Sequence, residues 1–374
     1  MRIAIDARGL LPQATGIGTY TRGIAAALAG RNGDTVGLFS PRPLPEGREI
    51  GPWTVSADSH PFGMLWAQTT LPVRAREWGA DVLLSALTIG PSASDDPPFV
   101  SVVHDLTPWT NPEWHARRTL VGFLPLWERT LERASRLLCV SETTARELLL
   151  HYPEAAPRIR VARNGVDADL SPGPWPPGAE AEKTRRQHAN GARFVLSLST
   201  LEPRKNIESL VVACERLWSR RRSRPDLVLA GGVGWKSGPL LRRIGRSPFR
   251  DKIHVLGYMP ARAARELYRA AEVFVYPSLS EGFGLPVLEA MACGAPVVAS
   301  TAPALVEVGG DAVLYAPPGD IAELTRQIER ALEEEPLRAR LRAAGPPRAA
   351  QFSWAAAAEA TAAVLEEAVR ERRP

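Results

Sequence analysis

Short apolar runs, typical of buried strands, alternate with helix-type patterns along the first half of the chain. The apolar runs occupy residues 2–7, 34–40, 81–87, 99–106 and 136–141, and the helix-type patterns occupy residues 19–29, 118–134 and 142–152. Strands that alternate with helices predict a parallel sheet joined by right-handed crossovers. The first half is therefore expected to form an α/β domain.

The alternation stops between residues 169 and 190, in a stretch that is rich in Pro and Gly and then charged, as linkers are. It then resumes. Strand patterns follow at residues 193–199, 227–232, 253–258, 273–278, 295–300 and 312–316, and helix patterns at residues 206–221, 261–271 and 285–293. We predict an N-terminal domain at residues 1–170, a linker at residues 171–190 and a C-terminal domain at residues 191–353.

The length of the chain supports two domains, since 374 residues exceed what one ordinary core holds. Each domain is expected to be a Rossmann-like, doubly wound parallel sheet that binds ligands at the carboxyl ends of its strands. The predicted fold class is thus α/β, with two such domains facing a cleft. An amphipathic helix at residues 354–374, with Ser353 as its candidate N-cap, is expected to pack back on the N-terminal domain.

An excess of positive charge narrows the choice of partners only slightly. The 46 Lys and Arg against 41 Asp and Glu give a formal net charge of +5, which favours phosphate-bearing ligands, anionic lipid or nucleic acid. No platform of basic and aromatic residues supports nucleic-acid binding, so no nucleic-acid partner is expected.

The chain shows no signal for export or membrane insertion. The first residues, MRIAIDARGL, lack the apolar core and cleavage site of a signal peptide, and no window reaches the roughly 18 apolar residues of a spanning helix. Cys139, Cys214 and Cys293 lie in apolar segments without metal-type spacing, which predicts buried free thiols in a reducing compartment. We expect a cytoplasmic protein whose membrane contact, if it has one, is peripheral and at the inner face.

The strongest chemical signal is a pair of carboxylates eight residues apart, Glu281 and Glu289. Glu281 follows a strand pattern and Glu289 lies in the next helix pattern, so both are expected on one helix face, with Glu281 at the positive N-terminus. Gly282 and Gly284 allow close backbone approach to a ligand, and free N–H groups at a helix start bind hydroxyls or phosphate. The alternative is a helix-start charge and a surface residue, but Glu289 lies in an apolar run where an unpaired charge is costly.

The stretch from Ser280 to Val298 resembles the E-x7-E signature of the retaining glycosyltransferases of family 4. The resemblance covers nearly the whole chain, with further segments in the family's order. These are Gly16-Ile-Gly18, His104-Asp105, Asn164-Gly-Val-Asp167, Glu202-Pro-Arg204-Lys205-Asn206 and Glu307-Val-Gly-Gly-Asp311. The resemblance implies the GT-B architecture and transfer of a sugar from a nucleotide-sugar donor.

The resemblance also implies roles for individual residues. Glu289 would hold the ribose of the donor, and Glu281 and the backbone of its glycine-rich loop would hold the sugar. Arg204 and Lys205 would bind the diphosphate and stabilise it as it leaves, so neither a metal nor a cofactor is expected. The expected donor-binding residues are Gly16, Gly18, Arg204, Lys205, Glu281, Gly282, Phe283, Gly284, Leu285 and Glu289, and the expected catalytic residues are His104, Arg204, Lys205 and Glu281.

Two features of the N-terminal domain complete the candidate site. Gly16 and Gly18 lie between the first strand and the first helix, where backbone N–H groups meet a phosphate or an acceptor; an ordinary tight turn is the alternative. His104 ends a strand pattern and should face the cleft, with Asp105 beside it to orient it. In the family the matching His contacts the donor sugar, which implies this role for His104. A role as general base stays open, since the leaving phosphate can itself take the acceptor proton.

The sequence therefore predicts a metal-independent glycosyltransferase that transfers a hexose, with retention of configuration, to a glycan, lipid-linked or small-molecule acceptor. The His104-Asp105-Leu106 and TGIGTY segments look most like mannosyltransferase members of the family, so GDP-mannose is the first donor to consider and a UDP-sugar the second. The adjacent Asp95 and Asp96 are interpreted as a solvated turn and not as a metal-binding pair.

Three other functions fit the sequence less well. A nucleotide-sugar epimerase does not account for Arg204 and Lys205 together with both carboxylates. An inactive nucleotide-sugar-binding scaffold would not need the intact set of charged residues. A nicotinamide dehydrogenase fits poorly, because the early Gly-x-Gly lacks the rest of the dinucleotide fingerprint.

One helix pattern suggests a membrane surface. It alternates bulky apolar with basic residues, namely Arg117, Arg118, Phe123, Leu124, Trp127, Arg129, Arg133 and Arg136. Such a helix can rest on an anionic bilayer. Because related enzymes often use lipid-linked acceptors, peripheral membrane contact is a further hypothesis.

Overall fold

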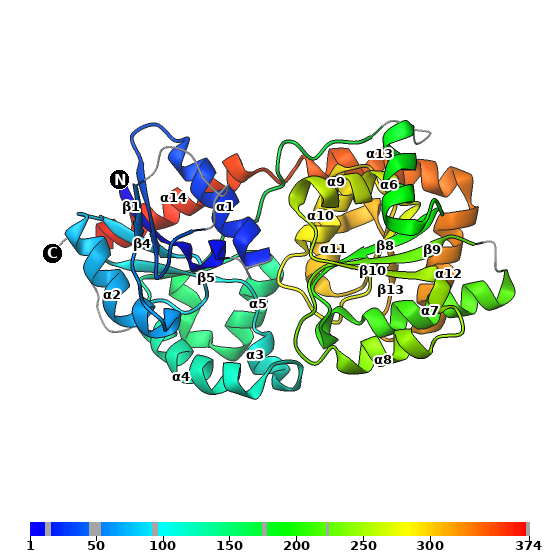
Figure 1. Ribbon diagram of the computed structural model, residues 1–374. Coiled ribbons are helices and arrows are strands. Elements are labelled where there is room, and N and C mark those ends of the chain that lie inside the picture. Colours follow the sequence, from blue (N-terminus) through cyan, green and yellow to red (C-terminus); the bar gives the residue numbers. More distant parts are fainter. Residues whose placement is uncertain (12–15, 45–53, 92–95, 174–177, 222–223, 372–374) are drawn as a thin grey trace. The chain divides into compact units, whose positions relative to one another are not determined.

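A computed structural model of the chain (Figure 1) describes residues 1–11, 16–44, 54–91, 96–173, 178–221 and 224–371. The chain divides into two compact units. Unit 1 comprises residues 1–112, 117–165 and 352–374, and unit 2 comprises residues 113–116 and 166–351. Each unit is built on its own parallel sheet, so the predicted fold class of two Rossmann-like α/β domains is confirmed.

Unit 1 contains a seven-stranded sheet in the order β3-β2-β1-β4-β5-β6-β7. Its strands are β1 (Arg2–Asp6), β2 (Thr35–Ser40), β3 (Thr54–Ala57), β4 (Val82–Ser85), β5 (Phe99–Val103), β6 (Arg136–Cys139) and β7 (Ile159–Val161). All neighbouring strands pair in parallel. The strand order reverses between β1 and β4, which places the ligand-binding switch point of a doubly wound sheet at their carboxyl edge.

Helices cover both faces of this sheet (Figure 1). They are α1 (Gly16–Ala29), α2 (Gly63–Glu77), α3 (Thr107–Thr110), α4 (Arg117–Arg133), α5 (Glu142–His151) and α14 (Trp354–Glu371). Apolar side chains of α2, α4 and α5 pack on one face, and α1 and α14 lie side by side on the other. Strands covered on both faces bury every residue, as β4 and β5 do, which explains their continuous apolar runs in the sequence.

Unit 2 contains a six-stranded sheet in the order β10-β9-β8-β11-β12-β13, again all parallel. Its strands are β8 (Phe194–Leu198), β9 (Asp226–Ala230), β10 (Ile253–Gly257), β11 (Val273–Tyr276), β12 (Val297–Ser300) and β13 (Leu314–Ala316). The order reverses between β8 and β11, so the switch point of this sheet lies at the carboxyl ends of these two strands.

The helices of unit 2 also form two layers (Figure 1). They are α6 (Ala179–Ala189), α7 (Ile207–Arg220), α8 (Gly238–Arg246), α9 (Ala261–Ala270), α10 (Leu285–Ala292), α11 (Pro303–Gly309), α12 (Ile321–Glu333) and α13 (Glu335–Ala349). Side chains of α7, α8 and α12 form a core with one face of the sheet, and α6, α9 and α10 cover the other face.

The predicted linker at residues 171–190 contains helix α6, which packs beside α9 within unit 2. Acidic residues occupy its first turn and basic residues its last, an order that suits the helix dipole. Asn190 ends it in the left-handed conformation, with φ of 50°. The charged stretch, interpreted above as part of a linker, is therefore a helix. Residues 174–177 lie outside the described residues.

Several smaller predictions concern exposure. Cys139, Cys214 and Cys293 are buried free thiols, as predicted. Among the described residues, no helix has both the length and the apolar character needed to cross a bilayer. Trp127 of α4, predicted to face a membrane, is fully buried, with its ring centroid 4.9 Å from that of Trp109. That part of the membrane hypothesis is wrong, because the indole belongs to the core of unit 1.

Candidate functional site

Two neighbouring strands of unit 2 bring the predicted cationic and acidic residues together. β8 and β11 pair in parallel at the point where the strand order reverses. Beyond β8 the chain forms a one-turn 3-10 helix, η4 (Pro203–Lys205), and beyond β11 it forms the loop that holds Glu281. Carboxyl ends of adjacent parallel strands share one edge, and at this edge Arg204 and Lys205 lie against Glu281.

These side chains form a closed cluster of ion pairs and hydrogen bonds. Lys205 Nζ lies 2.5 Å from Glu281 Oε1 and donates to the hydroxyl of Tyr276 at 2.9 Å. Arg204 Nη1 donates to Glu281 Oε2 at 3.0 Å, and its Nη2 lies 2.9 Å from Glu202 Oε1. Two cations face two carboxylates, so the cluster has no net charge as it stands.

Burial makes the cluster electrostatically strong. The side chains of Lys205 and Glu281 are each 9% exposed, and that of Glu202 is 2% exposed. Burial alone would raise the pKa of Glu281, but the nearby charges of Lys205 and Arg204 outweigh it and lower this pKa to about 2. Burial and Arg204 lower the pKa of Lys205, and Glu281 opposes that change. Glu281 is therefore an anion at any physiological pH and holds both cations in fixed positions.

Glu289 has different neighbours from Glu281. Helix α10 begins at Leu285, after Gly284 has turned the chain with φ of 105°, so Glu281 precedes the helix. The expectation that both carboxylates share one helix face is therefore wrong. Glu289 is half-buried on α10, and its Oε2 accepts a hydrogen bond of 2.9 Å from the hydroxyl of Tyr268 on α9. This contact orients the carboxylate that is predicted to hold the ribose.

The loop between the two carboxylates is tightly packed. A Cβ atom at Gly284 would lie 2.4 Å from Cδ2 of Leu305, and its positive φ also disfavours any other residue. Gly282, Phe283 and Leu285 are buried as well. The loop is thus closely packed within unit 2. Contact between its backbone and a sugar stays a prediction.

In unit 1, the predicted glycine pair belongs to a helix and not to a turn before it. Helix α1 begins at Gly16, where an added Cβ would meet no atom within 4 Å, and Gly18 is buried in its first turn. Packing therefore does not require glycine at position 16. Residues 12–15, which precede the helix, lie outside the described residues.

His104 directly follows β5, at the carboxyl edge of the sheet in unit 1, as predicted. Its Nε2 lies 2.8 Å from the carbonyl oxygen of Ala86, and its ring centroid lies 5.0 Å from that of Tyr20. Because a carbonyl only accepts, Nε2 carries the hydrogen and Nδ1 presents a lone pair. Burial lowers the pKa of His104, which keeps the ring neutral. The partner of Nε2 is thus Ala86, whereas Asp105 accepts from the backbone and hydroxyl of Thr107.

Sequence reasoning missed the tyrosines that support these groups. Tyr276 is the last residue of β11, and its place at a strand end at the switch point was a usable signal. Tyr268 lies on the apolar side of a helix, where a tyrosine is indistinguishable from an ordinary core residue. Tyr20 likewise appears as one apolar position of α1.

Among the described residues, no three His, Cys, Asp or Glu side chains gather as ligands of one ion would. Of the adjacent acidic pair that is interpreted above as a solvated turn, Asp95 lies outside the described residues and Asp96 precedes a cis proline.

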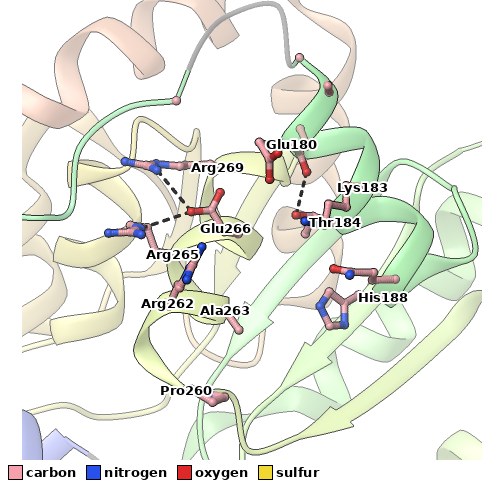
Figure 2. Close-up of a pocket in the computed structure, with 15 residues that line it drawn as sticks. Glu180, Lys183, Thr184, His188, Pro260, Arg262, Ala263, Arg265, Glu266 and Arg269 are labelled. Atoms are coloured by element: carbon pink, nitrogen blue, oxygen red, sulfur yellow. Dashed lines mark hydrogen bonds and ion pairs between the residues drawn. The ribbon is translucent and has the colours of Figure 1, made fainter.

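A cavity of about 800 Å³ lies in unit 2 apart from the predicted site residues (Figure 2). Basic side chains from α6 and α9 line it, including Lys183, Arg262, Arg265 and Arg269. Figure 2 shows Arg265 and Arg269 turned toward Glu266, whose Oε1 lies 3.3 and 3.4 Å from them. The protein thus neutralises part of this charge itself, and we assign no ligand to the cavity.

Comparison with known proteins gives one family match in each half of the chain. Residues 179–348 match the family described as glycosyl transferases group 1, and residues 14–170 match the one described as glycosyltransferase family 4. O-antigen chain mannosyltransferase B of Escherichia coli is 35% identical over 255 residues, which are 68% of this chain and 66% of that protein. The serotype-specific mannosyltransferase WbdA of Escherichia coli is 31% identical over 261 residues, 68% of this chain and 32% of that protein. The chain therefore spans 66% of the first relative and 32% of the second.

A solved structure shares the fold over nearly the whole chain. The protein HepE of Anabaena, crystallised with UDP and glucose, superposes with a TM-score of 0.77 at 21% identity, covering 98% of this chain and 99% of that one. At this level of identity the similarity concerns the fold alone.

Proposed function

We propose that this chain, which belongs to the group 1 glycosyl transferases and to glycosyltransferase family 4 with their GT-B fold, transfers a hexose from a nucleotide-sugar donor to an acceptor. The observation that carries the proposal is the buried cluster of Arg204, Lys205 and Glu281 at the switch point of unit 2. Doubly wound sheets bind nucleotides at this point. Cations fixed there can stabilise the charge that develops on a departing nucleoside diphosphate.

Lys205 retains one N–H group for a phosphate oxygen. An ammonium group has three N–H donors, and two of them go to Tyr276 and Glu281. Among the described residues the third has no acceptor. Because the carboxylates already balance both cations, the cluster is stable before the substrate arrives, and a phosphate can bind without rearranging it.

His104 is assigned to the sugar side of the reaction. Its neutral ring donates through Nε2 to Ala86 and keeps the Nδ1 lone pair to accept a hydrogen bond from a substrate hydroxyl. This role requires orientation and not charge. It differs in kind from that of Arg204 and Lys205.

The donor is proposed to be GDP-mannose, transferred with retention of configuration and without a metal. Both relatives described above are named mannosyltransferases, which favours mannose. A UDP-sugar is the competing choice, because HepE was crystallised with UDP and glucose. Arg204 and Lys205 would take the place of a metal by donating charge-assisted hydrogen bonds to the diphosphate, which supports metal independence.

The acceptor is proposed to be a saccharide chain, by analogy with the O-antigen chain in the name of one relative.

Peripheral contact with an anionic membrane remains part of the proposal, without a role for Trp127. Helix α4 exposes Val121, at 78%, beside Arg117, although Trp127 faces the core. Sedimentation with anionic liposomes at low salt tests this contact, and a protein that stays in the supernatant would remove it.

The first experiment screens the full chain in EDTA against GDP, UDP, ADP and dTDP by thermal shift, and then measures turnover with the matching nucleotide sugar. A ligand that binds only the folded state raises the unfolding temperature. We expect a shift with GDP, a mannosylated saccharide, and an anomeric configuration that NMR of the product shows to be retained.

The same experiment separates the alternatives. A shift without turnover on any acceptor would favour the inactive scaffold, and conversion of the nucleotide sugar into an isomer would favour the epimerase. If no nucleotide shifts the unfolding temperature of the intact protein, the assignment of unit 2 as donor domain is wrong.

A further inference from the structure

Three aromatic rings from distant parts of the sequence meet in unit 1. The ring of Tyr20, on α1, lies edge-on to that of His104, with centroids 5.0 Å apart and planes at 84°. The ring of Tyr20 also contacts that of Trp354, the first residue of α14, with centroids 6.2 Å apart and planes at 67°. His104 thus connects through one phenol ring to the start of the last helix of the chain.

Trp354 is seated where two glycines make room for it. A Cβ atom at Gly23, in the turn of α1 that follows Tyr20, would lie 2.2 Å from Cε2 of the indole. A Cβ atom at Gly165 would lie 2.1 Å from the backbone nitrogen of Trp354. Real Cβ atoms do not approach other atoms this closely. Both the ring and the backbone of Trp354 therefore depend on glycine at these positions.

The phenol ring of Tyr20 contributes through its shape and not through its hydroxyl. Tyr20 is 2% exposed, and its buried hydroxyl has no hydrogen-bond partner among the described residues. A buried hydroxyl without a partner destabilises the folded state. The ring contact with His104 is what the structure shows at this position.

We propose that Tyr20 and Trp354 are positioning residues for His104. The indole, fitted against Gly23, fixes the phenol ring of Tyr20. That ring and the carbonyl of Ala86 then hold the imidazole in one orientation, with hydrogen on Nε2 and a lone pair on Nδ1. The C-terminal helix α14 thereby sets the orientation of the His104 imidazole at the end of β5. The inference rests on the proposed function of His104.

The test compares Tyr20→Leu, which removes the ring, with Tyr20→Phe, which removes only the hydroxyl. We expect Tyr20→Leu to lower kcat by about tenfold, since small misplacements of a catalytic group are costly, and Tyr20→Phe to stay within about twofold of the native protein. Nucleotide affinity, which unit 2 provides, should be unchanged in both. Circular dichroism and the unfolding temperature show whether each variant is folded.

A second readout does not depend on activity. NMR of ¹⁵N-labelled histidine reports the tautomer of each of the 6 histidines, and loss of one signal in His104→Gln assigns His104. The native protein and Tyr20→Phe should show hydrogen on Nε2 alone, whereas Tyr20→Leu should show both tautomers. Trp354→Phe, a milder change, should give an intermediate mixture.

The outcomes separate this inference from the proposed function. A single Nε2–H tautomer and native kcat in Tyr20→Leu would overturn the positioning role, and so would Tyr20→Phe behaving like Tyr20→Leu. If His104→Gln transfers sugar at the native rate, the function proposed for His104 fails, while the tautomer measurement still decides whether the ring is positioned by Tyr20.

Discussion

The two units build their candidate sites from opposite kinds of interaction. In unit 2, Arg204, Lys205 and Glu281 form a buried cluster of full charges. In unit 1, His104 is a neutral ring held by Tyr20 and one carbonyl oxygen. The difference matches the two demands of the proposed reaction. A departing diphosphate requires fixed charge, whereas a sugar hydroxyl requires only an acceptor in the right place.

The sharpest test of the charged site is Lys205→Met, which keeps much of the side-chain volume and removes the cation. We expect kcat to fall by about 10² to 10³, as when one preorganised electrostatic group is removed from an active site. Stability should also fall, because Glu281 loses one of its two buried cationic partners and keeps only Arg204. Steady-state kinetics and urea unfolding measure the two effects.

Lys252→Met is the matched control. Its ammonium group lies 2.5 Å from Asp226 in the same unit, and its side chain is 13% exposed, close to the 9% of Lys205. It should lose stability but retain nucleotide binding and turnover. Equal losses of activity in both variants would mean that Lys205 acts only through stability.

His104→Gln tests the neutral site, with a smaller expected effect. Glutamine keeps one donor and one acceptor without the ring, so kcat should fall by about 10 to 10² while the affinity for nucleotide stays unchanged. Isothermal calorimetry with GDP and initial rates with GDP-mannose give the two quantities. A change in nucleotide affinity would contradict the separation between the charged and the neutral site.

Glu281→Gln shows whether the charged site also stabilises unit 2. The interactions of Glu281 in the folded protein lower its pKa from 4.5 to about 2. Its contribution to the free energy of unfolding is therefore fully present above pH 4.5 and is lost as the pH falls toward 2. The native protein should therefore lose more unfolding free energy between pH 7 and pH 3 than Glu281→Gln does. Glu180→Gln, at an exposed position of α6, should follow the native curve. Parallel curves for Glu281→Gln and the native protein would contradict the lowered pKa.

The charged site was the easier one to predict from sequence. Alternating strands and helices imply a parallel sheet, and adjacent carboxyl ends in such a sheet meet at one edge. The strand order was not predicted, and it is the pairing of β8 with β11 in the structure that brings Lys205 against Glu281. The relation between Glu281 and Glu289 was predicted wrongly, because Gly284 delays the start of α10.

The neutral site could be predicted only in part. The position of His104 at the end of β5 was predictable from the strand pattern. The rings that pack beside it come from α1 and from the C-terminal helix, and no local sequence pattern indicates that packing. Gly23 illustrates the reason. In the sequence it is a residue of low helix propensity inside a helix pattern, whereas in the structure it makes room for the side chain of Trp354. Helix α6 was missed for a different reason, since its charged composition was interpreted as that of a linker.

Gly23→Ala should give the smallest effect and shows that the neutral site depends on packing. The added methyl would lie 2.2 Å from the indole of Trp354, so the ring must move, and overpacking of this kind lowers stability by about 1–3 kcal/mol. Gly16→Ala is the matched control on the same helix, because its methyl would meet no atom within 4 Å. Adding Trp354→Leu to Gly23→Ala should recover part of the loss, since the smaller side chain leaves room for the methyl. The loss of stability should be independent of salt, because no charge is involved. Equal stability of Gly23→Ala and Gly16→Ala would mean that Trp354 is not held by α1.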